Sequence, residues 1–395
     1  MKKILPKGFL ASGIHCGLKK RKPDLALLYS KMGCKAAGIF TKNKVKAAPV
    51  LVSKAVLKQN KPIHAIITNS ANANCCTGWY GPRDAKRMMH AVGKSLKIGF
   101  NNILVMSTGI IGKRLPIEKI ENSVPKLVKT LSEKGLLSAS KAILTTGKKP
   151  RVYTEKIVVR GKEIIITGFA KGAGMINPNM ATMLAFLLTD ARVDKSALKG
   201  ALKEAADGTF NSITVDGDMS TNDSVILLAN GSAGNRPIKK ETKEYSVFLK
   251  ALTHICEKLS QDIIKDGEGA TKFVTVTVKS AATKKDACKV ARSIANSPLV
   301  KTSIHGENPN WGRVASSVGA SGAKSIAPNK IEVYLDEVCV FKNGKFTMPQ
   351  GLKYARIYKK KNVSVMVNLN AGKEEATVFT CDLSKKYVEI NARYS

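Results

Sequence analysis

A threonine at an abrupt change of composition is the residue of this sequence that could do the most distinctive chemistry. In "AKGAGMINPNMATMLAFLLTDA", residues 170–191, a glycine-rich polar stretch becomes apolar at Thr182, and the small Ala181 precedes it. A hydroxyl nucleophile needs a base, and a threonine that becomes an N-terminus can use its own α-amino group, whose ordinary pKa is about 7.7. The hydroxyl would first attack the carbonyl of Ala181, and hydrolysis of the resulting ester would free the amine. On the residues alone, a threonine that caps an element after a glycine-rich loop is the simpler interpretation.

Signatures of metal and nucleotide sites fail at their defining positions. Residues 215–223, VDGDMSTND, have the acidic density of a calcium loop, but Thr221 replaces the sixth-position glycine and Leu227 the bidentate glutamate. The glycine pair Gly172 and Gly174 is not followed by the third glycine of a dinucleotide fingerprint. The eight cysteines form no C-x-x-C pair, and the five histidines show no ligand spacing. We therefore expect neither a bound metal nor a bound cofactor.

The net charge of +37 raises the question of a nucleic-acid partner. The basic residues are spread along the whole chain, and no zinc-finger, RRM or basic-zipper pattern occurs. We interpret most of this charge as solvated surface and expect no nucleic acid, although a positive surface would attract small anionic substrates. No apolar run reaches about 18 residues, and Pro6 and Lys7 interrupt the N-terminal apolar segment. We expect a cytoplasmic protein that neither spans nor binds a membrane.

Strands and helices alternate along the chain, which predicts a layered α/β architecture with some antiparallel sheet. A polar stretch places a domain boundary near residue 280. Apolar patterning and turn residues predict strands at 62–70, 102–108 and 271–278, helices at 196–207, 245–264 and 286–296, and hairpins at 156–169 and 331–347, which turn near Arg160-Gly161 and at Asn343-Gly344.

A set of motifs in order along nearly the whole chain resembles the ornithine acetyltransferase family (glutamate N-acetyltransferase, arginine biosynthesis). The motifs are GFLASGIHCGLKKRKPDLALLYS, AAGIFTKNKVKAAPV, NSANANCCTG, STGIIGKRLPIEKI, KGAGMINPNMATMLAF, ITVDGDMSTND, DGEGATKF, NPNWGR and YVEINARYS.

The resemblance implies an N-terminal-nucleophile-type, αββα-like catalytic core at 1–280, followed by a smaller α/β domain at 281–395. It implies self-cleavage into an alpha chain, 1–181, and a beta chain, 182–395, which assemble as a heterotetramer of two copies of each. Thr182 would take the acetyl group from N2-acetyl-L-ornithine and pass it to L-glutamate in a ping-pong cycle. Acetyl-CoA is a second donor for some members of this family, and no feature of the sequence decides whether it is one here.

Site residues are carried over by matching motifs. Thr108 and Gly109 would form the oxyanion hole, through a hydroxyl and a backbone N–H. Lys171 would bind the α-carboxylate that both substrates carry. Without the resemblance, a strand-ending turn and an ordinary loop lysine are the simpler interpretations.

Four further residues are matched to substrate-binding positions. Thr146, with Thr145 as a one-residue alternative, would contact the substrate, and Glu268 would meet its amino group. Asn391 and Ser395 match a C-terminal asparagine and hydroxyl that reach the pocket. Taken alone, these side chains are a turn hydroxyl, a solvated carboxylate and parts of a chain end.

The sequence departs from the usual family pattern at four positions outside these residues. Ala71 stands where glycine is usual, Cys75 where alanine is usual, Met219 where threonine is usual and Asn308 where aspartate is usual. None of them is a proposed catalytic residue, so we expect an active enzyme.

Two other functions are kept open. An N-terminal-nucleophile amidohydrolase or aminopeptidase would form the same acyl-enzyme but use water as the acceptor. A basic nucleic-acid-binding protein would show salt-sensitive retention on DNA and no cleavage at Thr182.

Overall fold

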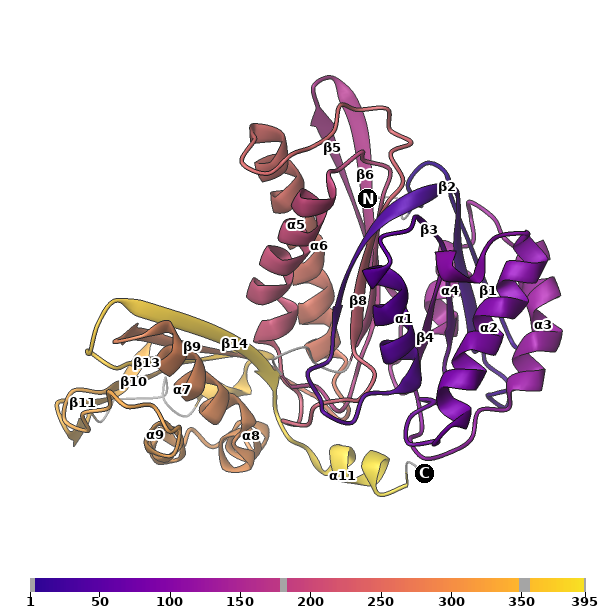
Figure 1. Cartoon of the computed structure of the whole chain (residues 1–395). Coiled ribbons are helices and arrows are strands. Elements are labelled where there is room, and N and C mark those ends of the chain that lie inside the picture. The colour runs from indigo at the N-terminus through magenta and orange to yellow at the C-terminus, as the bar shows by residue number, and fades with distance from the viewer. Residues whose placement is uncertain (1–3, 178–182, 348–355, 394–395) are drawn as a thin grey trace. The chain divides into compact units, whose positions relative to one another are not determined.

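Strand β2 (Leu25–Phe40) is 16 residues long and joins the two halves of a sheet that has eight strands in the described residues. Residues at its start pair with β1 (Phe9–Ile14) and β3 (Ile63–Asn69), and residues 35–40 pair with β8 (Ser224–Ala229). The strand order is β4-β3-β2-β8-β7-β6-β5, with β1 beside β2 (Figure 1). One strand therefore connects both halves of this sheet.

The computed structural model describes residues 4–177, 183–347 and 356–393, and the chain divides into two units. The first unit comprises Met1–Asn211 and Met219–Ile263, and the second comprises Ser212–Asp218 and Ile264–Ser395. The remaining elements of the first unit are α1 (Ala48–Lys58), α2 (Tyr80–Leu96), β4 (Ile103–Ser107), α3 (Ile117–Lys129), α4 (Leu136–Ala142), β5 (Arg151–Val159), β6 (Lys162–Lys171), β7 (Leu184–Thr189), α5 (Lys195–Gly208) and most of α6 (Lys243–Lys265), with short 3₁₀ turns at Phe100–Asn102 and Phe210–Ser212.

Strands β7 and β8, and β6 from Ile166 onward, are buried on both faces. The rings of Phe169 and Phe186 stack 4.7 Å apart and belong to the same buried cluster as Ile66 and Leu104 of the other half of the sheet. Gly168 faces the opposite side, where an added Cβ would lie 2.5 Å from Ile255 of α6. Helix α6 thus covers one face of these strands, and apolar side chains of both sheet halves share a core at the other.

Local sequence signals explain several elements of the second unit. Thr283 caps helix α7 (Lys284–Asn296) by accepting the N–H of Asp286, and Ser297 caps α8 (Pro298–His305), whose first residue is proline. The remaining elements are β9 (Phe273–Ala281), α9 (Trp311–Gly319), β10 (Glu332–Leu335), β11 (Val338–Lys342), β12 (Lys345–Phe346), a 3₁₀ turn (Ile357–Lys359), β13 (Asn362–Asn368), β14 (Glu374–Cys381) and α11 (Lys385–Asn391).

A second sheet, of order β12-β11-β10-β13-β9-β14, forms the core of this unit with α7. The predicted hairpin at 331–347 is more complex than expected, because the chain turns twice. Asp336 has φ +50° between β10 and β11, and Asn343-Gly344 turns between β11 and β12. Asp336 accepts the N–H and hydroxyl of Ser364, which holds the extra turn and gave no signal in the sequence.

The predicted mixed α/β class is confirmed, with a smaller α/β unit at the C-terminal end. The expected boundary near residue 280 differs from the division at Ile263 and Ile264, because β9 begins at Phe273 and pairs inside the second sheet with β13 and β14. The hairpin at 156–169 has Arg160-Gly161 at its turn, as predicted. No helix in the described part of the chain combines the length and the apolarity needed to cross a membrane.

Candidate active site

The turn after strand β4 places a buried hydroxyl beside the backbone N–H of Gly109. The N–H of Thr108 donates to the carbonyl of Asn69, at 3.1 Å, and that of Ile110 donates to the carbonyl of Ala71, at 3.2 Å. Among the described residues, no acceptor bonds the intervening N–H of Gly109. Gly109 has φ +141°, and a Cβ there would lie 2.1 Å from the backbone of Ala71, so only glycine fits this turn.

Lys171 and Thr108 meet, although 63 residues separate them in the sequence. The Lys171 ammonium donates to Thr108 Oγ1 at 2.9 Å, and the two residues are 5% and 6% exposed. Because the hydroxyl oxygen accepts this bond, its own hydrogen is available to donate elsewhere. An ammonium has three N–H donors, and the bond to Thr108 uses one of those of Lys171. The pair can thus orient a hydroxyl donor and supply a positive charge.

Asp223 adds a buried carboxyl group to this part of the first unit. It precedes β8, and the N–H of the next residue, Ser224, donates to the carbonyl of Met183, at 3.0 Å. In the sheet Lys171 pairs with Leu184, which in turn pairs with Ser224. Burial raises the pKa of Asp223 well above its ordinary value, and the positive charge of Lys171 opposes this rise.

Asn222 ties the loop at 70–78 to the end of β4. Its Nδ2 donates to the carbonyl of Ala73, at 2.7 Å, and to the carbonyl of Ser107, at 2.9 Å. Both acceptors flank the turn that carries Thr108, so Asn222 holds that turn in place. Sequence reasoning missed this role. The available signal is the motif ITVDGDMSTND, which belongs to the family resemblance but does not by itself indicate what Asn222 bonds.

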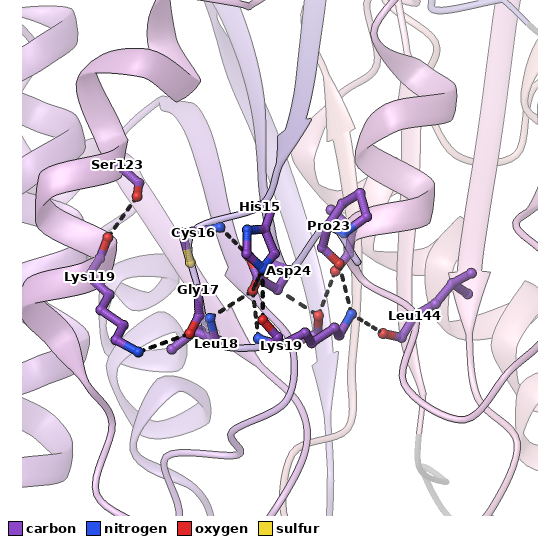
Figure 2. A network of polar contacts seen from close by, with 12 residues as sticks. His15, Cys16, Gly17, Leu18, Lys19, Pro23, Asp24, Lys119, Ser123 and Leu144 are labelled. Atoms are coloured by element: carbon purple, nitrogen blue, oxygen red, sulfur yellow. Dashed lines mark hydrogen bonds and ion pairs between the residues drawn. The ribbon is translucent and has the colours of Figure 1, made fainter. Parts of the chain in front are cut away.

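A second network fixes the loop between β1 and β2 (Figure 2). The fully buried carboxylate of Asp24 accepts three backbone N–H groups from residues 16–19, at 2.6–2.8 Å. The Lys19 ammonium donates to the carbonyls of Pro23 and Leu144, at 2.9 and 2.6 Å, and burial lowers the pKa of Lys19 to about 8. Lys19 therefore has a structural role and differs in this from the solvated surface lysines expected from the composition.

Thr146 lies two residues after Leu144, in the loop between α4 and β5. The side chain is half-buried, and no described hydrogen bond joins it to Thr108 or Lys171. Its predicted contact with a substrate stays a prediction. Its position depends on the loop that Lys19 holds.

Two other predicted residues meet in the second unit. Asn391, at the end of α11, donates from Nδ2 to Glu268 Oε2 at 2.8 Å. Gly269 has φ +73°, and a Cβ there would lie 2.5 Å from the backbone N of Tyr387, so the glycine lets α11 approach this loop. The amide donor leaves lone pairs of the Glu268 carboxylate free to accept an amino group. Ala181, Thr182 and Ser395 lie outside the described residues.

Similarity to known proteins defines the class to which this chain belongs. The sequence profile of the ArgJ family matches residues 10–395. The arginine biosynthesis bifunctional proteins ArgJ of Thermotoga neapolitana and Caldanaerobacter subterraneus are 44% and 46% identical to this chain, each over 99% of it and over 99% and 97% of their own lengths. A crystal structure of the arginine biosynthesis bifunctional protein ArgJ from Bacillus halodurans has 39% identity and a TM-score of 0.50, and the match covers 53% of this chain and 98% of that one.

Because its relatives are enzymes named for arginine biosynthesis, the chain is an enzyme of this class. The chain belongs to the ArgJ family, which confirms the family resemblance of its motifs.

One departure from the family pattern creates backbone strain beside the site. Ala71 has φ +79°, a conformation that favours glycine. We expect Ala71→Gly to stabilise the protein by about 0.5–1 kcal/mol, because relief of the strain exceeds the entropy that glycine adds to the unfolded chain. The measurement is the urea midpoint of unfolding. Ala73→Gly, at a buried position without positive φ, is the control and should lower the midpoint. A lower midpoint for Ala71→Gly as well would contradict the strain.

The buried carboxyl of Asp223 predicts a dependence of stability on pH. Because folding raises its pKa above 3.8, the folded state retains a proton that the unfolded state has released, and stability falls as the pH rises from about 4 through the folded-state pKa. Asp223→Asn removes this titration, so its free energy of unfolding should fall less than that of the wild type between pH 4.5 and 8. The exposed Asp218→Asn is the control and should follow the wild type. Parallel curves for Asp223→Asn and the wild type would rule out the effect.

Proposed function

We propose that the chain cleaves itself between Ala181 and Thr182 and that Thr182 then moves an acetyl group from N2-acetyl-L-ornithine to L-glutamate. The hydroxyl attacks the acetyl carbonyl, its proton passes through the new α-amino group to the leaving amine, and the C–N bond breaks to release L-ornithine. The amine of glutamate attacks the resulting ester, which gives N-acetyl-L-glutamate and restores the hydroxyl.

The contact between Lys171 and Thr108 carries the proposal. Oxygen develops negative charge in both halves of the cycle. The hydroxyl hydrogen of Thr108 and the N–H of Gly109, to which no described acceptor bonds, are two donors on one turn. Donors of this kind contribute about 3 kcal/mol each to transition-state stabilisation. Leu184, which pairs with Lys171, follows Thr182 by two residues in the sequence.

The second unit supports the substrate-binding part of the proposal. Glu268, held by Asn391, offers a carboxylate for the amino group of the substrate, and Lys171 offers an ammonium for the α-carboxylate. Both substrates carry an α-carboxylate for Lys171, and N2-acetyl-L-ornithine carries a free δ-amino group for Glu268. Thr146 and Ser395 complete the proposed set of substrate contacts.

The chain length of a relative of known structure supports cleavage. The matched chain from Bacillus halodurans is covered over 98% of its length by 53% of this chain, so it is only about half as long. A product of cleavage near the middle of the chain would have this length.

The proposal includes a heterotetramer of two alpha and two beta chains, no bound cofactor and a cytoplasmic location. A relative from Dictyostelium discoideum is named mitochondrial.

Thr182→Ala should abolish both cleavage and turnover, because it removes the only hydroxyl that the proposed chemistry uses as a nucleophile. The mass of the denatured wild-type protein should show two fragments that meet at Ala181 and Thr182, and Thr182→Ala should show one intact chain. Thr182→Ser, which keeps a hydroxyl, is the matched control and should still be cut. A cleaved and active Thr182→Ala protein would refute the mechanism.

The acceptor separates transfer from hydrolysis in the same assay. Ornithine release that requires added glutamate supports the transferase, whereas equal release without glutamate would assign a hydrolase. Replacing acetylornithine by acetyl-CoA tests the second donor.

Thr108→Val should lower kcat about 10²–10³-fold, because it removes one oxyanion donor while keeping the shape of the side chain. The measurement is steady-state transfer from acetylornithine to glutamate. Thr277→Val, in β9 of the second unit, replaces a half-buried threonine whose hydroxyl bonds to that of Thr377, and it should leave kcat unchanged. Wild-type kcat in Thr108→Val would exclude the hydroxyl from the oxyanion hole.

A further inference from the structure

Helices α1 and α5 both contact strand β2 (Figure 1). Residues of all three elements line a groove on the first unit. It consists of two adjoining cavities of about 660 and 380 Å³, which share Ala36, Leu57 and Asn60 in their walls. None of the residues assigned to the candidate active site lines either cavity. The larger volume lies in the range of small-molecule sites, about 300–1,000 Å³.

The walls of this groove carry two ladders of lysines. Lys54 and Lys58 lie one turn apart on α1, and Lys195, Lys199 and Lys203 lie at successive turns of α5. Like charges at this spacing destabilise a helix. Burial, and after it the charge of Lys199, lower the pKa of Lys195. The repulsion between these positive charges therefore lowers the stability of the folded chain.

Acidic side chains compensate little of this charge. Asp207 lines the larger cavity and pairs with Lys203 at 2.8 Å. Within the described part of the chain, Lys54, Lys58 and Lys199 form no ion pair with an acidic group. Three ammonium groups on facing helices therefore remain available to a negatively charged ligand.

The base of the groove is apolar. Ile39, Phe40 and Leu57 are each half-buried and line the larger cavity. Gly38 lies among them, and a Cβ there would lie 2.6 Å from Leu57 and 3.0 Å from Phe40, so the glycine lets these apolar side chains pack closely against the strand. A ligand for this groove needs both negative charge and an apolar or aromatic portion.

We propose that this groove binds a nucleotide-sized polyphosphate ester, with the phosphates on the lysines of α1 and α5 and the ring on the apolar base. Lysine ammonium groups bind phosphate as point charges, and a ring has a flat apolar surface for Ile39 and Phe40. A second copy of the chain fits this groove poorly, because it would bring the same positive charges against it. The proposal is independent of the acetyl transfer.

Binding of ATP to the full-length protein, measured by calorimetry at fixed ionic strength, tests this site. We expect one ATP per chain, bound more tightly than inorganic tripolyphosphate. The triple variant Lys54→Gln, Lys58→Gln, Lys199→Gln should weaken ATP binding about tenfold or more, because three charges that face the phosphates are lost. The triple variant Lys126→Gln, Lys129→Gln, Lys134→Gln removes the same net charge from exposed lysines of α3 and the turn after it, and should retain the affinity. Both variants should keep cleavage and acetyl transfer.

Three results would overturn the site. An equal loss of affinity in the two triple variants would mean that binding follows net charge. Equal affinity for ATP and tripolyphosphate would exclude the apolar base. Tighter binding of a single-stranded oligonucleotide, lost in the same groove variant, would assign the groove to a nucleic acid.

Discussion

The pairing of β2 with both halves of the N-terminal sheet is the constraint on which the candidate site depends. Thr108 follows β4 and Lys171 ends β6, and four strands lie between these two in the sheet order. Strands are spaced about 4.8 Å apart, so in a flat sheet the two residues would be roughly 24 Å apart. Their 2.9 Å contact requires the sheet to bend, and β2 permits this because different segments of it pair with β3 and with β8.

Apolar packing in the core stabilises the bent form of the sheet. Phe169 and Phe186 stack within the same buried cluster as Ile66, so apolar contacts between the halves hold the sheet in its bent form. Two features at the end of this core lower the stability of the fold. Asp223 is buried with a raised pKa, and Ala71 adopts a strained backbone beside Gly109. Such departures from local stability are expected where the fold positions reactive groups.

The positive charge of the chain serves more than one purpose. Lys171 is buried against a hydroxyl, and Lys19 holds two backbone carbonyls that order the loop before Thr146. The ladders on α1 and α5 face each other across a cavity. Identical side chains thus act as a buried donor, a structural tie or part of a groove, according to the burial and the neighbours that the fold gives them.

Local periodicity, turn residues and ordered motifs were sufficient to predict the α/β class, most elements and the family. The sequence indicated Thr108, Gly109, Lys171, Glu268 and Asn391 as site residues only through the resemblance. Tertiary structure decided which of them meet, because contacts between residues 63 or 123 positions apart depend on strand order and on the bend of a sheet, which local patterns do not encode. The roles of Asn222 and Lys19 emerged in the same way, since their acceptors are backbone carbonyls, and every residue has a carbonyl.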